Sequence, residues 1–242
     1  MANILDKYGI KEVADVTFYK INDDGTPGAA VLYLDTLKVS TIEQTAEQVD
    51  ARGGKGNPRL ITWDYNKDIT VTLEDALFSA KSMAVMFGDG EAIATTNSGI
   101  QKTIGFTFES GQTKVENGGH DFVLASASSI YNTSGTTVST ADLSAGQYYY
   151  GIWTVTDNAA VTIDINSDTF PGTYYITGDT FARAELTGKD EFFQFVIPKA
   201  KVSAENTITL EAEGDPSVFN LNLTVLKQRG KPLMQLIKYN VD

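Results

Sequence analysis

A single histidine and the absence of cysteine limit the chemistry that this chain could perform. A Ser–His nucleophilic system would have to use His120, which lies in the glycine-rich stretch GGHD at residues 118–121. A general base has to be held firmly beside the group that it deprotonates, and no Gly-x-Ser-x-Gly elbow accompanies this histidine. We therefore interpret His120 as a surface polar residue and do not expect nucleophilic catalysis.

Two acidic clusters contain the oxygen ligands that calcium prefers. The spacing of the first three ligands of a calcium loop occurs at Asp164, Asn166 and Asp168. Thr169, however, stands where such a loop needs its turn glycine, and Tyr175 stands where it needs a bidentate glutamate. The second cluster, NDDG at residues 22–25, is typical of an Asx turn. We therefore predict neither a metal site nor a cofactor, and no spacing among the 31 acidic residues singles out a carboxylate pair for glycoside hydrolysis.

The stretch GGKG at residues 53–56 is glycine-rich, as phosphate-binding loops are. It lacks the Gly-x-x-x-x-Gly-Lys-Ser/Thr spacing of such a loop, and no helix follows it directly. We interpret it as the flexible tip of a loop.

Aromatic residues gather at Tyr148, Tyr149, Tyr150 and Trp153. Exposed rings of this kind could stack on a sugar. Alternation along a strand would bury about half of them, so packing in a core is the favoured interpretation.

The charge balance is strongly acidic, with 19 basic and 31 acidic residues and a formal net charge of −12. A protein that grips nucleic acid neutralises phosphates with lysine and arginine, so this surface should repel DNA. The first 20 residues lack the apolar core of a secretory signal, and no apolar run approaches the roughly twenty residues of a membrane span. We expect a protein that is made in the cytoplasm and stays soluble until it assembles or is released.

Short alternating runs predict a mainly β fold. Strands are expected at residues 13–19, 30–34, 69–73, 92–96, 104–108, 148–155, 160–165, 172–177, 192–197, 208–212, 219–226 and 233–239. Their regular short spacing favours an antiparallel β-sandwich or barrel. A β-rich chain of 242 residues fits one domain, and its 42% hydrophobic content suffices for a core.

One α-helix is expected to flank this sheet. Its apolar face consists of Leu77, Ala80, Ala84 and Phe87, which recur at helical spacing. Thr72 and Asp75 have the spacing of a capping box, and Gly88 occupies the position of a left-handed C-terminal cap.

Residues 44–59 are predicted to form a long loop between two strands. The segment has about sixteen residues, is rich in Gln, Gly and mixed charge, and far exceeds the roughly two to five residues that a hairpin needs. Loops of that length are usually functional or disordered. A second unusual stretch, residues 111–146, is rich in Ala, Ser and Thr and indicates surface hairpins or an insertion. A linker to a second sandwich is the alternative for that stretch.

The order of these elements resembles that of bacteriophage tail tube proteins, also called major tail proteins. The first similar block is residues 44–88, with ARGGKGNP at 51–58 in the long loop, the return strand at 60–73 and the flanking helix. The second is residues 190–242, with FQFVIPKAKV at 193–202, EGDPSVF at 213–219 and a closing strand. Compared with the smallest tube subunits, residues 111–187 are extra. The resemblance thus implies a single tail-tube-like domain over residues 1–242, in which 111–187 is an elaboration or insertion on the outer surface.

The resemblance also implies a function. It predicts a virion structural protein without enzymatic activity, whose copies form rings, hexameric in this family, that stack into a tail tube around a tape-measure protein. DNA would leave the capsid through an acidic channel that repels phosphates and does not bind them specifically. Sheath, tail-terminator and baseplate proteins are further partners to consider.

In this family the long loop is expected to reach the neighbouring ring. The contact residues that the resemblance assigns to it are Glu47, Asp50, Arg52, Gly53, Gly54, Lys55, Gly56 and Arg59. Two alternatives remain open at this point. One is a β-sandwich that binds a carbohydrate or a receptor through Tyr149 or Trp153, and the other is a capsid decoration or baseplate protein.

Overall fold

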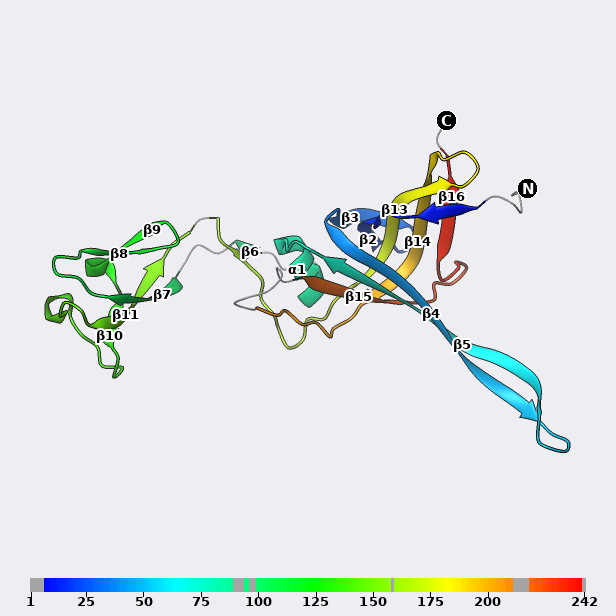
Figure 1. Ribbon diagram of the computed structural model, residues 1–242, viewed down its shortest axis with the longest axis horizontal. Helices are drawn as coiled ribbons and strands as arrows, with labels where there is room; N and C mark the ends of the chain where they lie inside the picture. Colours follow the sequence, from blue (N-terminus) through cyan, green and yellow to red (C-terminus); the bar gives the residue numbers. More distant parts are fainter. Residues whose placement is uncertain (1–6, 89–93, 96–98, 158, 211–217, 241–242) are drawn as a thin grey trace. The chain divides into compact units, whose positions relative to one another are not determined.

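The computed structural model describes residues 7–88, 94–95, 99–157, 159–210 and 218–240 (Figure 1). Within this part of the chain the fold is mainly antiparallel β with one α-helix, which confirms the fold class predicted from the alternating runs. The chain divides into two compact units. The larger unit combines residues 1–93 with 163–242, and the smaller unit is residues 94–162.

A nine-stranded antiparallel sheet forms the larger unit (Figure 1). Its strands are β1 (Tyr8–Ile10), β2 (Asp15–Ile21), β3 (Pro27–Leu34), β4 (Leu37–Arg52), β5 (Arg59–Asp75), β13 (Thr173–Ala184), β14 (Asp190–Val202), β15 (Phe219–Val225) and β16 (Gln235–Tyr239). They are bonded in the order β3-β2-β13-β14-β15-β5-β4, with β1 added to β13 and β16 to β14. The two ends of the sequence therefore build one sheet, because β13 pairs with β2 and β15 pairs with β5.

One face of this sheet forms the core of the larger unit. Side chains that are at most 1% exposed come from five strands, namely Phe18, Leu73, Ile176, Ile197 and Leu221. In β5 the predicted alternation is confirmed, since Ile69, Val71 and Leu73 are buried and Thr70 between them is exposed. The apolar residues of the sequence thus define the buried face by their period of two.

Helix α1 (Ala80–Phe87) lies next to this core and contributes Val85 and Met86 to it. The helix starts with a capping box in which Ser79 Oγ accepts a hydrogen bond from the Ser82 N–H at 2.9 Å, and Ser82 Oγ accepts one from the Ser79 N–H, also at 2.9 Å. These two bonds satisfy donors that the first helical turn leaves unpaired. The predicted helix is confirmed, with a later start.

The predicted helix caps are both wrong. Thr72 and Asp75 belong to β5, and the Asp75 carboxylate accepts hydrogen bonds from Thr36 Oγ1 at 2.5 Å and from the Leu77 N–H at 3.3 Å. Asp75 therefore anchors the chain where the strand ends and delays the helix. Gly88 has a φ of −145°, which is extended backbone and not the left-handed conformation expected of a cap.

The smaller unit has its own sheet and core. Its three-stranded antiparallel sheet consists of β10 (Ser129–Asn132), β11 (Tyr148–Val155) and β7 (Ile100–Thr107). The remaining elements are the hairpin β8 (Lys114–Asn117) and β9 (His120–Val123), the 3₁₀ turns η1 (Leu124–Ser126) and η2 (Thr140–Asp142), and the short pair β6 (Ala94–Thr95) and β12 (Val161–Thr162). The buried core includes Trp153, whose Nε1 donates a 2.8 Å hydrogen bond to the carbonyl of Val123.

The smaller unit and the predicted elaboration 111–187 have different bounds. The unit starts at residue 94 and ends at 162, and residues 173–184 form β13 inside the sheet of the larger unit. Among the other expected strands, residues 208–210 lie in no strand, and parts of 92–96 and 208–212 lie outside the described residues. In the described part of the chain, no helix has the length and apolar content to cross a membrane.

The contact between Gly178 and Phe195 gives a test of the core. An added Cβ at Gly178 would lie 2.1 Å from ring atoms of Phe195, which is 3% exposed and cannot move into solvent without leaving the core. Gly178→Ala should lower the free energy of unfolding by about 1–3 kcal/mol, measured by urea unfolding followed by circular dichroism. Gly9→Ala is the matched control, because Gly9 is also a strand residue but no atom lies within 4 Å of its added Cβ. Equal stability of the two variants would contradict this packing.

Candidate assembly surface

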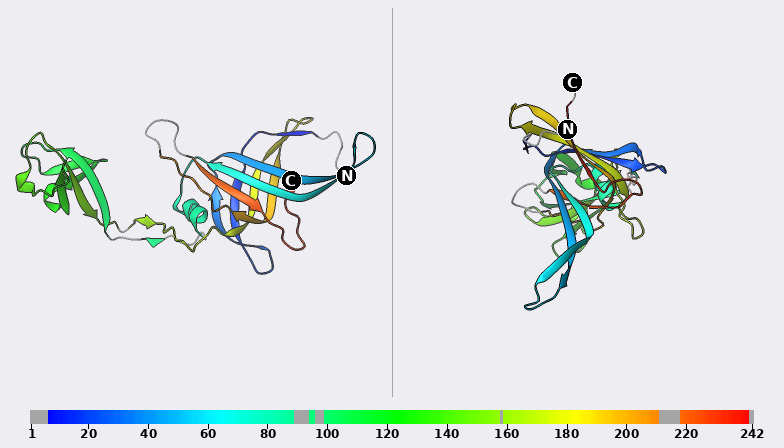
Figure 2. Two further views of the ribbon diagram at one scale, coloured as in Figure 1. Left: turned by 90° about the horizontal axis from the view of Figure 1, so that it is seen from below. Right: turned by 90° about the vertical axis from the view of Figure 1, so that its right-hand side faces the viewer.

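The hairpin of β4 and β5 extends beyond the sheet of the larger unit (Figures 1 and 2). β15 pairs with β5 only between Thr70 and Asp75. From residue 68 outward, β5 is paired with β4 alone. We call residues 45–68 the arm. Every residue of the arm is exposed except Asp50, Ala51 and Gly53, which are half-buried.

The arm replaces the loop that the sequence predicted at residues 44–59. β4 continues to Arg52 and β5 begins at Arg59, so the connection is residues 53–58. The prediction failed because the arm buries neither of its faces. Polar and charged residues can then occupy both sides of a strand, and the composition is that of a loop.

The glycine-rich tip is an ordered turn. Gly54 and Gly56 have φ values of 82° and 83°, a region that side chains rarely adopt. The Gly53 N–H donates to the carbonyl of Pro58 at 3.3 Å, and the Asn57 N–H donates to that of Gly54 at 3.1 Å. The two glycines therefore let the chain reverse direction within six residues.

The outer part of the arm has one apolar face and one polar face. On the apolar face, cross-strand pairs join Val49 with Trp63, Ala51 with Ile61 and Glu47 with Tyr65. The exposed fractions of the large apolar side chains are 51% for Val49, 53% for Ile61, 52% for Trp63 and 47% for Tyr65. A two-stranded hairpin needs a third strand or a packing partner to be stable in water, so this face is a candidate surface for association.

The polar face is held by hydrogen bonds between the two strands. Gln48 Nε2 donates to Asp64 Oδ1 at 2.8 Å, and Thr62 Oγ1 donates to Asp50 Oδ1 at 2.8 Å. The other oxygen of Asp50 accepts from Arg59 Nε at 2.8 Å and lies 3.2 Å from an Arg52 guanidinium nitrogen. These bonds lower the pKa of the Asp50 carboxyl, first through the hydrogen bond from Thr62 and then through the two arginines.

A bulge decides which way the apolar face points. Thr45 pairs with Asp68 and Glu47 with Tyr65, so β5 has one residue more than β4 in this interval, where Asn66 has a φ of 48°. Before the bulge, even-numbered residues of β4 lie opposite the buried residues of β5, as Ile42 does opposite Val71. After the bulge, the odd-numbered Val49 lies opposite Trp63. Because an extra residue reverses the alternation of its strand, the apolar face of the arm lies on the opposite side of the hairpin from the core.

The expected contact residues therefore divide into three groups. Arg52 and Arg59 are both bonded to Asp50 within the arm. Glu47 and Lys55 are exposed, and the tip glycines form the turn. Trp63 and Tyr65 were not expected as contact residues. The available signal was the alternation of apolar and polar residues from Ile61 to Tyr65, in a run of β-prone residues.

A second exposed aromatic surface crosses the larger unit's sheet. Phe181 of β13, Phe192 of β14 and Tyr239 of β16 are cross-strand neighbours, with ring centroids 5.6 Å and 5.3 Å apart. The first two are 50% and 37% exposed. We call these three residues the aromatic strip.

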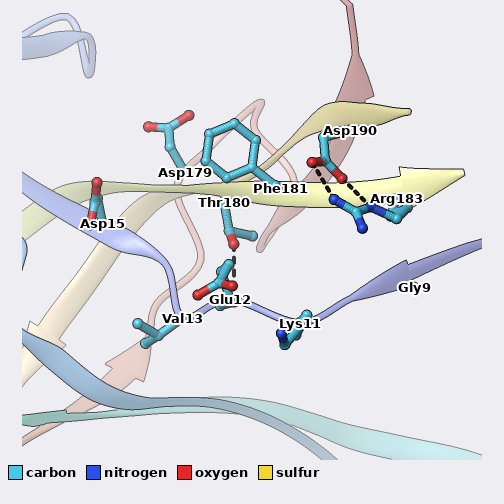
Figure 3. Close-up of a pocket in the computed structure, with 10 residues that line it drawn as sticks. All are labelled: Gly9, Lys11, Glu12, Val13, Asp15, Asp179, Thr180, Phe181, Arg183 and Asp190. Carbon is cyan, nitrogen blue, oxygen red and sulfur yellow. Dashed lines mark hydrogen bonds and ion pairs between the residues drawn. The ribbon is translucent and has the colours of Figure 1, made fainter. Parts of the chain in front are cut away.

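A cleft of about 560 Å³ lies beside Phe181 (Figure 3). Its charged lining consists of two basic residues and four acidic ones, namely Lys11, Arg183, Glu12, Asp15, Asp179 and Asp190. Asp190 forms a two-bond pair with Arg183 at 2.6 and 2.7 Å, and Asp179 Oδ1 accepts from Gln194 Nε2 at 2.7 Å. Asp15 Oδ2 accepts from the Tyr33 hydroxyl at 3.3 Å. The border of the aromatic strip thus has more acidic than basic residues, and three of its carboxylates have bonding partners within the chain.

The remaining candidates from the sequence are not brought together. His120 is exposed at the start of β9, opposite Asn117. Tyr149 and Trp153 are 6% and 3% exposed. The favoured interpretation of core packing is confirmed for these two side chains, and the alternative of a sugar site at them is wrong. Among the described residues, no three acidic or histidine side chains are grouped so that they could hold a metal ion.

Comparison with known proteins gives one result that spans both units. The model of a family described as the YomU/Tube protein family matches residues 8–235. No curated protein sequence matches the chain. The matched range covers most of the chain and includes the arm, the aromatic strip up to β14 and the smaller unit.

The bonds to Asp50 predict a pH response of the arm. Because the pKa of Asp50 in the folded arm lies below its ordinary value of 3.8, the stability from these bonds is present above that value and is lost as the pH falls through the folded pKa. In an NMR titration, Thr62→Val should raise the pKa of Asp50 toward the ordinary value, because it removes the hydrogen bond that lowers this pKa most. The pKa of Asp190, lowered by Arg183, is the internal control and should not move. An unchanged pKa of Asp50 in Thr62→Val would contradict the role of this hydrogen bond.

Proposed function

Because the chain belongs to the YomU/Tube protein family and is a phage tail tube protein, we propose that its copies form stacked rings whose channel conducts DNA during ejection. Membership implies self-association into a tube and a place in the virion tail. The observation that carries the finer proposal is the arm, whose apolar face is exposed in the single chain. Its role is structural, and the proposal includes no catalytic step.

Covering the apolar face would stabilise a contact between copies. The four large side chains of this face are each about half exposed. Removing the remaining area from water contributes about 1 kcal/mol for each of them, hence about 4 kcal/mol for one arm. Since every subunit of a ring has an arm, these contributions add over the ring, and weak single contacts give a stable stack.

A tube grows only if one surface of a subunit meets a different surface of the next. Such a head-to-tail contact leaves an unused surface at each end, whereas a contact between identical surfaces closes after two copies. We infer that the apolar face of the arm docks on the aromatic strip of a copy in the adjacent ring. The net charges agree. Arg52, Lys55 and Arg59 lie at or beside the tip, where Asp50 is the acidic partner of the two arginines. The cleft beside the strip has four acidic residues and two basic ones.

In this arrangement the expected contact residues of the arm have different roles. Lys55 and Glu47 contact the adjacent ring directly. Asp50, Arg52 and Arg59 first hold the two strands of the arm together and contribute their outward edges. The tip residues Gly53, Gly54 and Gly56 let the turn fit closely against the other copy.

The proposed channel is acidic. A net charge of −12 per subunit lets DNA slide without being held, since like charges at close range repel phosphates. Following the family resemblance, the rings are hexamers built around a tape-measure protein. We place the smaller unit on the outer surface of the tube, together with those residues of 111–187 that are not part of β13. The smaller unit has its own core, so it folds without adding strands to the nine-stranded sheet.

Trp63→Ser tests the arm. It removes the largest side chain of the apolar face, and long tubes should be lost in negative-stain electron microscopy and light scattering at rising protein concentration. The free energy of unfolding should fall by only about 1 kcal/mol, because about half of the Trp63 side chain is already exposed in the single chain. Lys67→Ser is the control, since Lys67 is an exposed residue of the same strand that belongs neither to the apolar face nor to the bonds between the strands. Tubes of normal length from Trp63→Ser would refute the proposed role of the arm.

Mixing two variants tests the head-to-tail contact. Phe181→Ser should also prevent growth, while Phe170→Ser, at an exposed phenylalanine outside the strip and the cleft, should not. Trp63→Ser retains an intact aromatic strip and Phe181→Ser retains an intact arm. When rings of each variant are prepared separately and then mixed, sedimentation velocity should detect double rings and no long tubes. Absence of double rings, or regrowth of long tubes, would contradict docking of the arm on this strip.

A further inference from the structure

The smaller unit exposes a face that carries three tyrosines. In the β10–β11–β7 sheet, the buried side chains Ile104, Phe106, Ile130, Tyr149 and Trp153 all lie on one side. Alternation places Tyr148 and Tyr150 of β11 on the opposite side, where Tyr150 is paired with Tyr131 of β10. We call the side chains of Tyr131, Tyr148 and Tyr150 the tyrosine platform.

The rings of this platform have a defined arrangement. Tyr131 and Tyr150 are stacked, with ring centroids 5.1 Å apart and an interplanar angle of 17°. Tyr148 is 53% exposed and lies across Gly105 of β7, where an added Cβ would be only 1.9 Å from the Tyr148 hydroxyl oxygen. The absence of a side chain at residue 105 therefore lets the Tyr148 ring lie against the backbone.

The rest of this face is uncharged and rich in hydroxyl groups. The pairing of the three strands and the bridge from Tyr131 to Thr137 add the positions Gln101, Thr103, Thr107, Ser129, Thr137, Ile152 and Thr154. These described positions include no acidic or basic residue, in a chain with 19 basic and 31 acidic residues. A polyanion would find no cation here, and a polycation would find no carboxylate.

We propose that the tyrosine platform binds a neutral polysaccharide chain. A pyranose ring has faces of C–H groups and a rim of hydroxyl groups. Its faces pack on aromatic rings, and its rim can bond to the Thr, Ser, Gln and tyrosine hydroxyl groups around them. Neither side has to desolvate a charge, so covering this face carries no such penalty.

The composition of the face favours a sugar over a protein. The core of a protein–protein interface is apolar, and the single aliphatic side chain here is Ile152, which is half-buried. A stacked pair of tyrosine rings beside the exposed Tyr148 ring, surrounded by hydroxyl groups, instead matches a ligand that alternates apolar and polar groups along its length. The platform therefore gives the smaller unit a binding role that is separate from growth of the tube.

Affinity electrophoresis of the full chain tests this site. The gels contain hydroxyethyl cellulose, laminarin or dextran as neutral polymers, or polygalacturonate as an anionic one. At least one neutral polymer should retard the wild-type protein, and polygalacturonate should not. Tyr150→Ala should weaken the affinity for that polymer about tenfold.

Gly105→Ala provides a second variant that removes no aromatic group. The new methyl group displaces the Tyr148 ring, the flexible end of a side chain, and should weaken binding by a similar factor while circular dichroism stays unchanged. Tyr33→Ala, at an exposed tyrosine of the larger unit, is the control and should bind as the wild type does. Neither platform variant should change tube length.

Three results would overturn the proposal. They are lack of retardation by every neutral polymer, equal retardation of the wild type and both platform variants, and loss of tubes in Tyr150→Ala without loss of retardation. The last result would assign the platform to a contact between copies. Because the tube is measured in the same samples, failure of the sugar site is distinguishable from failure of the proposed tube.

Discussion

A two-stranded hairpin has no second layer against which to bury an apolar face, and this constraint governs the arm. Inside the sheet, β5 is supported by β15 and buries Ile69, Val71 and Leu73. Beyond Thr70 that support ends, while large apolar residues continue to Ile61. The part of β5 inside the sheet is stabilised by burying its apolar side chains in the core of its own subunit. The arm can bury its apolar side chains only against another molecule. The proposed association through the arm thus follows from where β15 stops.

The bulge near Asn66 determines how this surface can be used. Ile61, Trp63 and Tyr65 have the same parity in the sequence as Ile69 and Val71, and together they form what would be one continuous apolar stripe. The extra residue in β5 divides this stripe between two sides of the hairpin. One part closes the core of its own subunit and the other is presented outward. The polar bonds of Asp50 and Asp64 keep the two strands paired while that face is uncovered.

The same alternation accounts for the smaller unit. Four aromatic residues in β11 divide by period two, so that Tyr149 and Trp153 form a core while Tyr148 and Tyr150 face outward. The sequence reasoning correctly favoured packing for about half of these residues, but it assigned the sugar alternative to the two side chains that are buried. Which half is inside depends on the neighbours β7 and β10, and these come from other parts of the chain. Local spacing has no information about them.

The sequence by itself determined the mainly β fold, the helix that ends at Phe87 and the buried side of β5. Each of these follows from the spacing of apolar residues over a few neighbouring positions. Only the tertiary structure decided that residues 44–59 continue two strands, and that Ser79 rather than Thr72 caps the helix. It also decided that β13 enters the central sheet. The physical reason is shared: hydrogen-bond partners, strand ends and bulges depend on residues distant in the chain, whereas a side chain's tendency to be buried is its own property.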